Sequence, residues 1–354
     1  MAILASETPS STAIVILNWN GKKYLEQFLP SVLQNSAGCE VIVADNASTD
    51  DSVAFLQQHY PQVRLIRHEV NLGFCGGYNE ALKQVNSKFY VLLNSDVEVT
   101  PNWTQPVIKL MEQDEQIAAC QPKIKAFHQP DYFEYAGAGG GYIDSLGYPF
   151  CRGRIFDDLE KDKGQYNDVR EVFWATGACM FVRASAYQEL GGLEENFFAH
   201  MEEIDLCWRF HNAGYKVYYC GKSEVYHVGG GTLHKSNPRK TYLNFRNGLS
   251  LLYRNLPDKQ LNTTIFKRMV LDGVAAAKMM ASGQLKDTQA IYKAHQDFKK
   301  VKPLWLQKRT EQPDKKPLTS LPGTYKGSIV WDYFIGKKKT FEALQVPDGA
   351  PLTA

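Results

Sequence analysis

Long hydrophobic runs are missing from this sequence. The most apolar stretch near the C-terminus is broken by Lys267, Arg268, Asp272 and Lys278, so no transmembrane span is expected. The first eleven residues do not place a basic flank before an apolar core, so we expect no signal peptide and a disordered N-terminus over residues 1–11. Cysteine pairs at zinc-site spacing are also missing. The seven cysteines are scattered and odd in number, which favours a reducing, cytoplasmic location.

Neither sign of charge is in large excess, but the charges are segregated. The chain carries +2 over 354 residues, with 44% hydrophobic and 22% charged residues, which is an ordinary globular composition. Residues 235–339 contain 22 Lys and Arg against 7 Asp and Glu, a balance of +15, while residues 1–234 contain 18 against 29, a balance of −11. A basic segment beside an acidic body indicates an anionic partner surface, either membrane lipid or nucleic acid. The alternative is a merely solvated basic face.

A short apolar run at residues 89–93 is the feature around which the rest of the chain is organised. It predicts a strand buried on both faces of a parallel sheet, and Asn94, Ser95 and Asp96 follow it directly. In an open α/β sheet, ligands bind beyond the carboxyl ends of the strands. Asp96 is suited to hold a hard divalent cation that bridges a diphosphate, and the alternative is that it caps the next helix.

Three similar strand and helix pairs precede this strand. Strands are expected at 12–17, 40–44 and 63–67, and helices at 22–35, from about 50 onward and at 78–85. The alternation predicts a Rossmann-like, mostly parallel α/β sheet flanked by helices. Asp45 ends the second strand, where a carboxylate can accept a hydrogen bond from a nucleotide, whereas Asp50 lies in the first turn of a helix. Three glycines within residues 71–79 would allow a bound group to approach closely, or would simply pack a helix on the sheet.

Regular patterns are weaker in the following segment. Residues 127–170 are rich in Gly, Tyr and Asp and are expected to form loops over one edge of the sheet. Residues 172–183 predict a strand interrupted by a turn at Gly177. Within it, Trp174 either stacks on a sugar face or belongs to the core, as a tryptophan in such a strand more often does.

Glu202, Glu203 and Asp205 form an acidic cluster at a helix start. The helix dipole explains part of it, so the alternative is a charged first turn on a solvated face. At about 100° per residue, Glu202 and Asp205 fall on nearly one side of the helix and Glu203 projects away from both. One carboxylate can therefore face the crevice while another anchors the helix.

His227 lies just before the three glycines at 229–231. A lone histidine is more often a packing residue than a ligand. Here the glycines would let the backbone turn tightly against a phosphate, and a neutral imidazole can complete a metal shell begun by Asp96. His234 and Arg239 are weaker candidates for contacts to a diphosphate.

Four motifs occur in order: TAIVILNWN at 12–20, DNASTD at 45–50, NLGF at 71–74 and LNSD at 93–96. In order and spacing they resemble the successive signatures of glycosyltransferase family 2, in its bacterial rhamnosyltransferase-like branch, over roughly residues 12–255. The resemblance implies a GT-A fold, an inverting hexosyltransferase, a nucleotide-diphospho-sugar donor linked to dTDP or UDP, and Mg²⁺ or Mn²⁺ as cofactor. One departure is Asn94, which stands where many relatives have the first aspartate of the DxD motif.

The resemblance also implies roles for single residues. It makes Asp96 and His227 metal ligands and Glu203 the catalytic base that takes the proton of the acceptor hydroxyl. The other candidates are expected to contribute to substrate binding: Asn18, Asn20, Asp45, Asp50, Asn71, Gly73, Phe74, Asn94, Ser95, Trp174, Gly177, Glu202 and Asp205.

The C-terminal part lies beyond these motifs. Helices are expected at 262–281 and 284–300, and the first carries an apolar stripe that could pack on the catalytic domain, form a homodimer or lie in a membrane interface. Residues 308–323 resemble a linker. The aromatic and lysine cluster at 331–341 would suit an interfacial anchor.

The sequence thus predicts a GT-A domain over 12–257 and a basic helical extension with a tail over 258–354. The expected reaction moves a sugar, such as rhamnose, to a hydroxyl of a glycan or lipid-linked acceptor in cell-surface polysaccharide assembly, with peripheral association with anionic membrane and no nucleic acid partner. One alternative is a metal-dependent nucleotidyltransferase, which would not need the acidic cluster together with His227. The other is a non-catalytic membrane-associated scaffold of the same fold, whose site should be damaged, and no such damage is visible.

Overall fold

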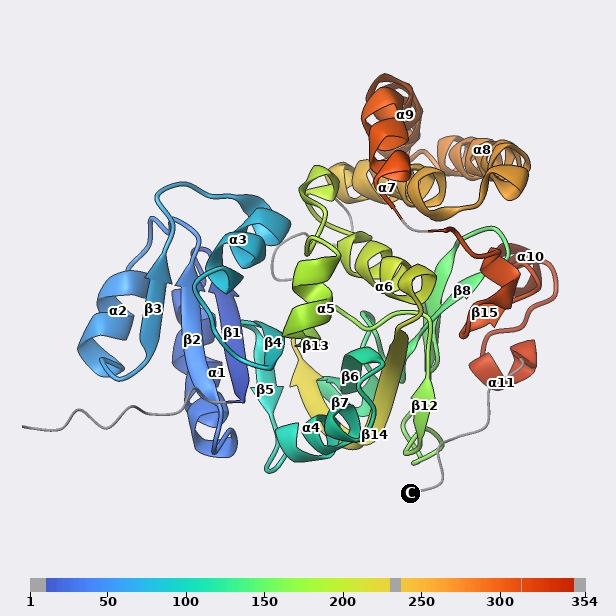
Figure 1. The fold of residues 1–354 in the computed structure, drawn as a ribbon. Helices are drawn as coiled ribbons and strands as arrows, with labels where there is room; N and C mark the ends of the chain where they lie inside the picture. Colours follow the sequence, from blue (N-terminus) through green and yellow to red (C-terminus); the bar gives the residue numbers. More distant parts are fainter. Residues whose placement is uncertain (1–10, 230–236, 313, 347–354) are drawn as a thin grey trace, which may run out of the picture.

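A computed structural model describes residues 11–229, 237–312 and 314–346 (Figure 1). Of residues 1–11, which were expected to be disordered, residues 1–10 lie outside the described residues, and so do the candidates Gly230, Gly231 and His234. None of the helices in the described part of the chain combines the length and the apolar character needed to cross a membrane.

The N-terminal third is the predicted series of parallel strands and helices. Its elements are β1 (Thr12–Asn18), α1 (Lys22–Asn35), β2 (Glu40–Asp45), α2 (Ser52–His59), β3 (Arg64–Arg67), α3 (Gly73–Leu82) and β4 (Phe89–Asn94). β1 pairs in parallel with β2 and with β4, so that Asn18 lies beside Asp45 and Leu17 beside Asn94. The polar residues that end these strands therefore meet at one edge of the sheet.

The apolar runs are continuous because both faces of this sheet are covered. Along β1, Ala13 and Val15 belong to one buried cluster and Ile14 and Ile16 to the other. Successive side chains of a strand point to opposite faces, so a strand without alternation is what a sheet covered on both sides requires. A sheet with a buried cluster on each face is the arrangement that the expected GT-A fold requires.

The sheet continues with strands of mixed direction. Its further elements are β5 (Val97–Val99), α4 (Thr104–Gln113), β6 (Ile117–Ala126), β12 (Val169–Glu171), β13 (Cys179–Arg183), α5 (Ala184–Glu189) and β14 (Lys216–His227). In the described residues the order across the sheet is β12, β14, β6, β13, β4, β1, β2, β3. β13 runs antiparallel to both β4 and β6, and β14 runs parallel to β6.

The segment 127–170 is not a set of loops, contrary to the expectation. It contains β7 (Gln129–Phe133), β8 (Gly141–Asp144), β9 (Pro149–Cys151), β10 (Arg154–Ile155) and β11 (Asp158–Leu159). β8 to β11 form a second, smaller sheet, which is completed by β15 (Thr324–Tyr325) running parallel to β8. Strands of two to five residues are too short to show a period of two in the sequence, and one partner lies about 180 residues further along the chain.

The C-terminal helices have bounds that differ from those expected. They are α6 (Glu202–Ala213), α7 (Pro238–Asn255), α8 (Asp258–Ala281), α9 (Leu285–Thr310), α10 (Ile329–Phe334) and α11 (Phe341–Leu344), with short 3₁₀ turns η1 (Glu195–Phe197) and η2 (Leu318–Ser320). α7, α8 and α9 pack on one another, and α7 also contacts α6 (Figure 1). α9 continues about ten residues beyond the expected end, into the segment expected to be a linker.

The extension is joined to the rest of the fold. In addition to the strand pairing of β15, Trp305 of α9 packs on Phe197 of η1 with the ring centroids 5.0 Å apart and the rings tilted by 34°. In the aromatic cluster expected to be an anchor, Phe341 is buried against Tyr142 of β8, whereas Trp331 is exposed. The domain boundary at residue 257 stays a prediction, but the two segments share a sheet.

Candidate active site

The ends of β1 and β2 form the first wall of the site. Asp45 is buried, and its two carboxylate oxygens accept from the Asn18 side-chain amide at 3.1 Å and from the Ser48 backbone N–H at 3.0 Å. The carbonyl oxygen of the Asn18 side chain is buried and has no hydrogen-bond partner among the described residues. These contacts order the loop after β2 and leave acceptor capacity on both side chains.

Asn20 and Asp50 hold the neighbouring turns. Asn20 has a positive φ of 51°, and its side-chain oxygen accepts from the backbone N–H groups of Thr49 at 2.7 Å and Asp50 at 3.2 Å. The Asp50 carboxylate accepts from the N–H groups of Lys22 and Ser52, at the starts of α1 and α2. Burial alone would raise the pKa of Asp50, but these hydrogen bonds outweigh it and lower the pKa. Both residues therefore fix the backbone of the turns that follow β1 and β2.

Asn46, which the sequence did not single out, organises the start of α3. Its side-chain amide donates to the Asn71 side chain at 3.1 Å and to the Gly73 carbonyl at 2.9 Å, and its oxygen accepts from the Leu72 N–H. Gly73 has a φ of +72°, which favours glycine. α3 begins here, five residues before the expected start.

Phe74, Gly177 and Glu203 meet, although they lie far apart in the sequence. A Cβ atom on Gly177 would lie 3.4 Å from the Phe74 ring and 3.9 Å from the Cβ of Glu203. The next residue, Ala178, accepts a backbone hydrogen bond from Asn94 at the end of β4. Glu203 is thereby placed at the same edge of the sheet as the residues after β4.

Asp96 and His227 are brought together by strand pairing. β5 runs antiparallel to β14 and places His227 beside Val97. The Nε2 atom of His227 lies 3.2 Å from Oδ1 of Asp96, and both side chains are buried. The sequence predicted that these two residues share a site, and the geometry is compatible with it.

Glu134 approaches the other ring nitrogen of His227 and was missed by the sequence reasoning. Its Oε2 lies 3.4 Å from Nδ1, a close ionic contact without hydrogen-bond alignment. Burial would lower the pKa of His227, but the Asp96 and Glu134 carboxylates outweigh it and raise the pKa to about 10. Gly229, with φ of +71°, makes room for Glu134, because a Cβ there would lie 2.6 Å from Oε1.

These residues fit a divalent cation. In the part of the chain that the structure describes, no group of three or more His, Cys, Asp or Glu is arranged to hold a metal by itself. Asp96 and His227 offer an oxygen and a nitrogen ligand, and Mg²⁺ or Mn²⁺ sites in transferases commonly take their other ligands from substrate phosphates and water. A cation on Nε2 would replace its proton, and the negative charge of Glu134 would favour a remaining proton on Nδ1.

The three carboxylates at the start of α6 have different environments. Glu202 and Glu203 each have one buried oxygen without a hydrogen-bond partner among the described residues. Burial raises the pKa of Glu203 to about 7, and burial together with the charge of Glu203 raises the pKa of Glu202 well above its usual value. A carboxylate such as that of Glu203, with one oxygen free of partners and a pKa near neutrality, is suited to accept a proton.

Asp205 is fully buried and turned toward α7. It accepts hydrogen bonds from Arg209, Arg254 and Asn255, each at 2.8 Å. Glu203, by contrast, lies against Gly177 and Phe74. The helical spacing predicted this division between an anchoring and a crevice-facing carboxylate.

Trp174 belongs to the core. Its indole N–H donates to the Tyr142 carbonyl at 2.9 Å, and its ring lies against Gly141, where a Cβ would come within 2.2 Å of it. Only 5% of the residue is exposed, so it offers no open face to a sugar. The structure therefore does not support stacking of Trp174 on a substrate. It shows the alternative, in which Trp174 is a core residue.

Comparisons with known proteins identify the family and support the fold. The glycosyl transferase family 2 model matches residues 13–191, just over half of the 354 residues. The family match and the fold together define a glycosyltransferase of the GT-A class. The chain belongs to glycosyltransferase family 2.

The relatives include rhamnosyltransferases. An N-acetylglucosaminyl-diphospho-decaprenol L-rhamnosyltransferase of Mycobacterium tuberculosis is 28% identical, over 60% of this chain and 75% of that protein. The rhamnosyltransferase WbbL of Escherichia coli is 25% identical, over 70% of this chain and 93% of that protein.

A solved structure supports the fold. A crystal structure of GalNAc-T7 with UDP, GalNAc and Mn²⁺ superposes with a TM-score of 0.55 at 15% identity, over 71% of this chain. The match spans about half of that protein, 49% of its chain, and shows likeness of fold alone.

Proposed function

We propose that this glycosyltransferase moves a sugar, with rhamnose as the first candidate, from a dTDP- or UDP-linked donor to a hydroxyl of a lipid-linked glycan acceptor, with inversion at the anomeric carbon. The observation that carries the proposal is the placement of the partly buried Glu203, one of whose carboxylate oxygens is buried without a hydrogen-bond partner among the described residues, at the same sheet edge as the Asp96 and His227 pair. The names of the relatives support rhamnose and a diphospho-lipid acceptor. The reaction would take place at the cytoplasmic face of a membrane, during cell-surface polysaccharide assembly.

The proposed chemistry is one displacement. Glu203 takes the proton of the acceptor hydroxyl while that oxygen forms a bond to the anomeric carbon and the bond to the diphosphate oxygen breaks. Asp96 and His227 would hold Mg²⁺ or Mn²⁺, which when bound neutralises the charge on the departing diphosphate. Asp45 and Asn18 would bind the nucleoside, whereas Phe74 and Gly177, beside Glu203, would lie near the transferred sugar.

A panel of nucleotide sugars tests the donor. We expect dTDP-rhamnose or a UDP-sugar to bind in calorimetry only when Mn²⁺ or Mg²⁺ is present, and the bound donor to be consumed when a GlcNAc-diphospho-lipid analogue is added. Binding without turnover on any acceptor would favour the scaffold alternative. Release of inorganic diphosphate from a nucleoside triphosphate would favour the nucleotidyltransferase.

A face of α8 is a candidate for membrane attachment. Phe266, Val270 and Val274, spaced by four residues, form one row on this helix, and their exposed fractions are 69%, 51% and 62%. We call this row the α8 face. Residues four apart share one side of a helix, so the row is a continuous apolar strip open to solvent.

The surroundings of the α8 face favour anionic lipid as its partner. Lys278 of α8 lies over the ring of Phe334, 4.2 Å from its centroid, which joins α8 to α10. On and after α10, Trp331 and Ile335 are also exposed. Because residues 235–339 carry a balance of +15, apolar insertion and attraction to anionic headgroups would act together.

Liposome flotation tests the α8 face. We expect recovery with anionic vesicles at low salt, weaker recovery at high salt because salt screens the attraction, and strong loss in the Phe266→Ser/Val270→Ser double variant. Tyr292→Ser, which removes an exposed side chain of α9, is the control. Equal recovery with neutral vesicles would contradict the proposal, and a dimer in light scattering that the double variant abolishes would assign the face to a second copy.

A further inference from the structure

The loop before α6 has a strained backbone next to the acidic cluster. Phe198, His200 and Met201 have φ values of +68°, +67° and +76°, although none of them is glycine. Non-glycine residues adopt this region at a cost in free energy, and such conformations persist only where the surroundings hold them. Met201 is the last residue before the helix, and its carbonyl accepts the first helical hydrogen bond, from Asp205. The orientation of Glu202 and Glu203 therefore depends on this loop.

Asn247 of α7 contacts the loop at three backbone carbonyls. Its side chain is fully buried, and its amide nitrogen lies 3.0, 2.8 and 2.8 Å from the carbonyl oxygens of Phe197, Ala199 and His200. The two amide protons are thus shared among three carbonyl groups of the loop that contains the strained residues. The Asn247 oxygen accepts from Arg246, which fixes which end of the amide faces the loop.

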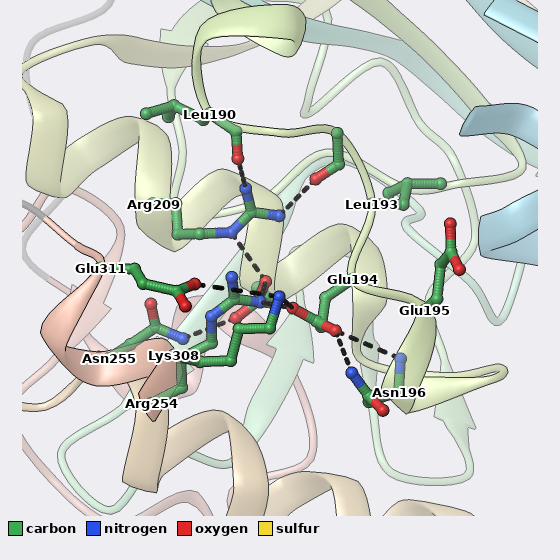
Figure 2. Close-up of polar contacts among 12 residues, drawn as sticks. Leu190, Leu193, Glu194, Glu195, Asn196, Arg209, Arg254, Asn255, Lys308 and Glu311 are labelled. Atoms are coloured by element: carbon green, nitrogen blue, oxygen red, sulfur yellow. Dashed lines mark hydrogen bonds and ion pairs between the residues drawn. The ribbon is translucent and has the colours of Figure 1, made fainter. Parts of the chain in front are cut away.

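A second set of contacts fixes the other side of α6. Arg254 donates to Asp205 at 2.8 Å and lies 3.0 Å from Glu194, which in turn lies 3.5 Å from Lys308 of α9. Figure 2 shows Arg209, Arg254 and Glu194 converging where α6, α7 and α9 meet. A buried, paired network of this kind holds one geometry, since breaking a member leaves a buried charge uncompensated.

We propose that Asn247 is a positioning residue for transfer, which acts by holding loop 197–201 so that Glu203 faces the acceptor hydroxyl. This inference rests on the proposed function and on Glu203 as the base. It assigns a role to α7, which lies outside the part of the chain matched by the family model. The Arg254 and Asp205 contacts anchor the helix itself, whereas Asn247 sets the turn from which the helix starts.

Asn247→Ala is the main test. We expect its single-turnover transfer rate at saturating substrates to fall about 10²-fold, because small misplacement of a catalytic group has an effect of this order. Metal-dependent donor affinity should stay close to that of the wild type. Amide hydrogen exchange in residues 197–205 should speed up. Ser250→Ala is the matched control, since Ser250 lies on the same helix, is buried and has a hydroxyl without a partner among the described residues.

Met201→Gly gives a readout that a merely stabilising role would not move. Glycine adopts a positive φ without penalty and is accepted at a helix N-cap. In the Asn247→Ala background, Met201→Gly should restore part of the transfer rate. By itself, Met201→Gly should lower the stability, because it removes side-chain packing and raises the conformational entropy of the unfolded chain. If Asn247→Ala does not fold, Arg246→Ala takes its place, since it removes donors to the Asn196 and Phe197 carbonyls.

Two outcomes would overturn the inference. One is an Asn247→Ala protein with the wild-type transfer rate. The other is an Asn247→Ala protein that loses transfer rate and donor affinity equally and whose rate Met201→Gly does not restore. If the wild type transfers no sugar, the proposed function fails, but exchange at 197–205 still reports whether Asn247 holds the loop.

Discussion

Asp96→Asn and His227→Ala are each expected to remove most metal-dependent donor binding. Both side chains lie at the strand ends, buried and 3.2 Å apart, and each would contribute one of the two protein ligands. Loss of an outer-shell partner already costs about 10- to 100-fold in metal affinity, so loss of a ligand should cost at least that. Titration of Mn²⁺ with nucleoside diphosphate in a calorimeter measures it.

Two further variants sharpen this test. Glu134→Gln keeps the shape beside Nδ1 and removes its charge, so it should give a smaller loss than His227→Ala. Glu98→Gln removes a carboxylate two residues beyond Asp96 and serves as the control. Unchanged metal-dependent affinity in both ligand variants would remove the assignment of the metal site.

Glu203→Gln should abolish most transfer while leaving donor and metal binding nearly intact. Removal of a positioned base costs roughly 10²- to 10⁴-fold in rate, or about 3 to 5 kcal/mol of barrier. The glutamine keeps the side-chain shape but cannot accept the proton as the carboxylate does. Single-turnover transfer measured beside calorimetric donor binding separates the two effects.

The neighbouring carboxylates are the comparison variants. Glu202→Gln should cost less, because Glu203 remains in place. Asp205→Asn should act through the position of α6, with a lowered melting temperature, since Arg209, Arg254 and Asn255 all donate to this carboxylate. A well-folded but inactive Asp205→Asn beside an active Glu203→Gln would contradict the assignment within the cluster.

The parallel half of the fold was predictable because its signals are local. The runs at β1, β2 and β4 are long enough to identify as buried strands, and α1 has the expected bounds. Polar residues directly after such strands must lie at one edge of the sheet, which is why Asp45 and Asp96 could be placed at that edge. The pairing of Asp96 with His227 was also expected, from the residue types and from the family resemblance.

The remaining parts depend on contacts between distant residues. Nothing near Glu134 in the sequence shows that it meets His227, about 90 residues away, and Asn247 meets the loop before α6 across about 50 residues. β8 to β11 are too short to show a period, and β15 reaches them from the C-terminal segment. Gly77 was a candidate for close approach of a ligand, yet a Cβ there would lie 2.8 Å from Leu17, so its role is helix packing on β1.

The pH dependence of single-turnover transfer, measured for the wild type and for Glu203→Gln, tests the central claim most directly. Burial raises the pKa of Glu203 to about 7, and a general base acts in its deprotonated form. The wild-type rate should therefore fall about tenfold per pH unit as the pH drops below the pKa of the base, and level off above it. The residual rate of Glu203→Gln should lack this fall at low pH, which we call the acidic limb. A wild-type rate that is independent of pH between 5 and 8, or a Glu203→Gln variant that keeps both the rate and the acidic limb, would show that another group takes the proton.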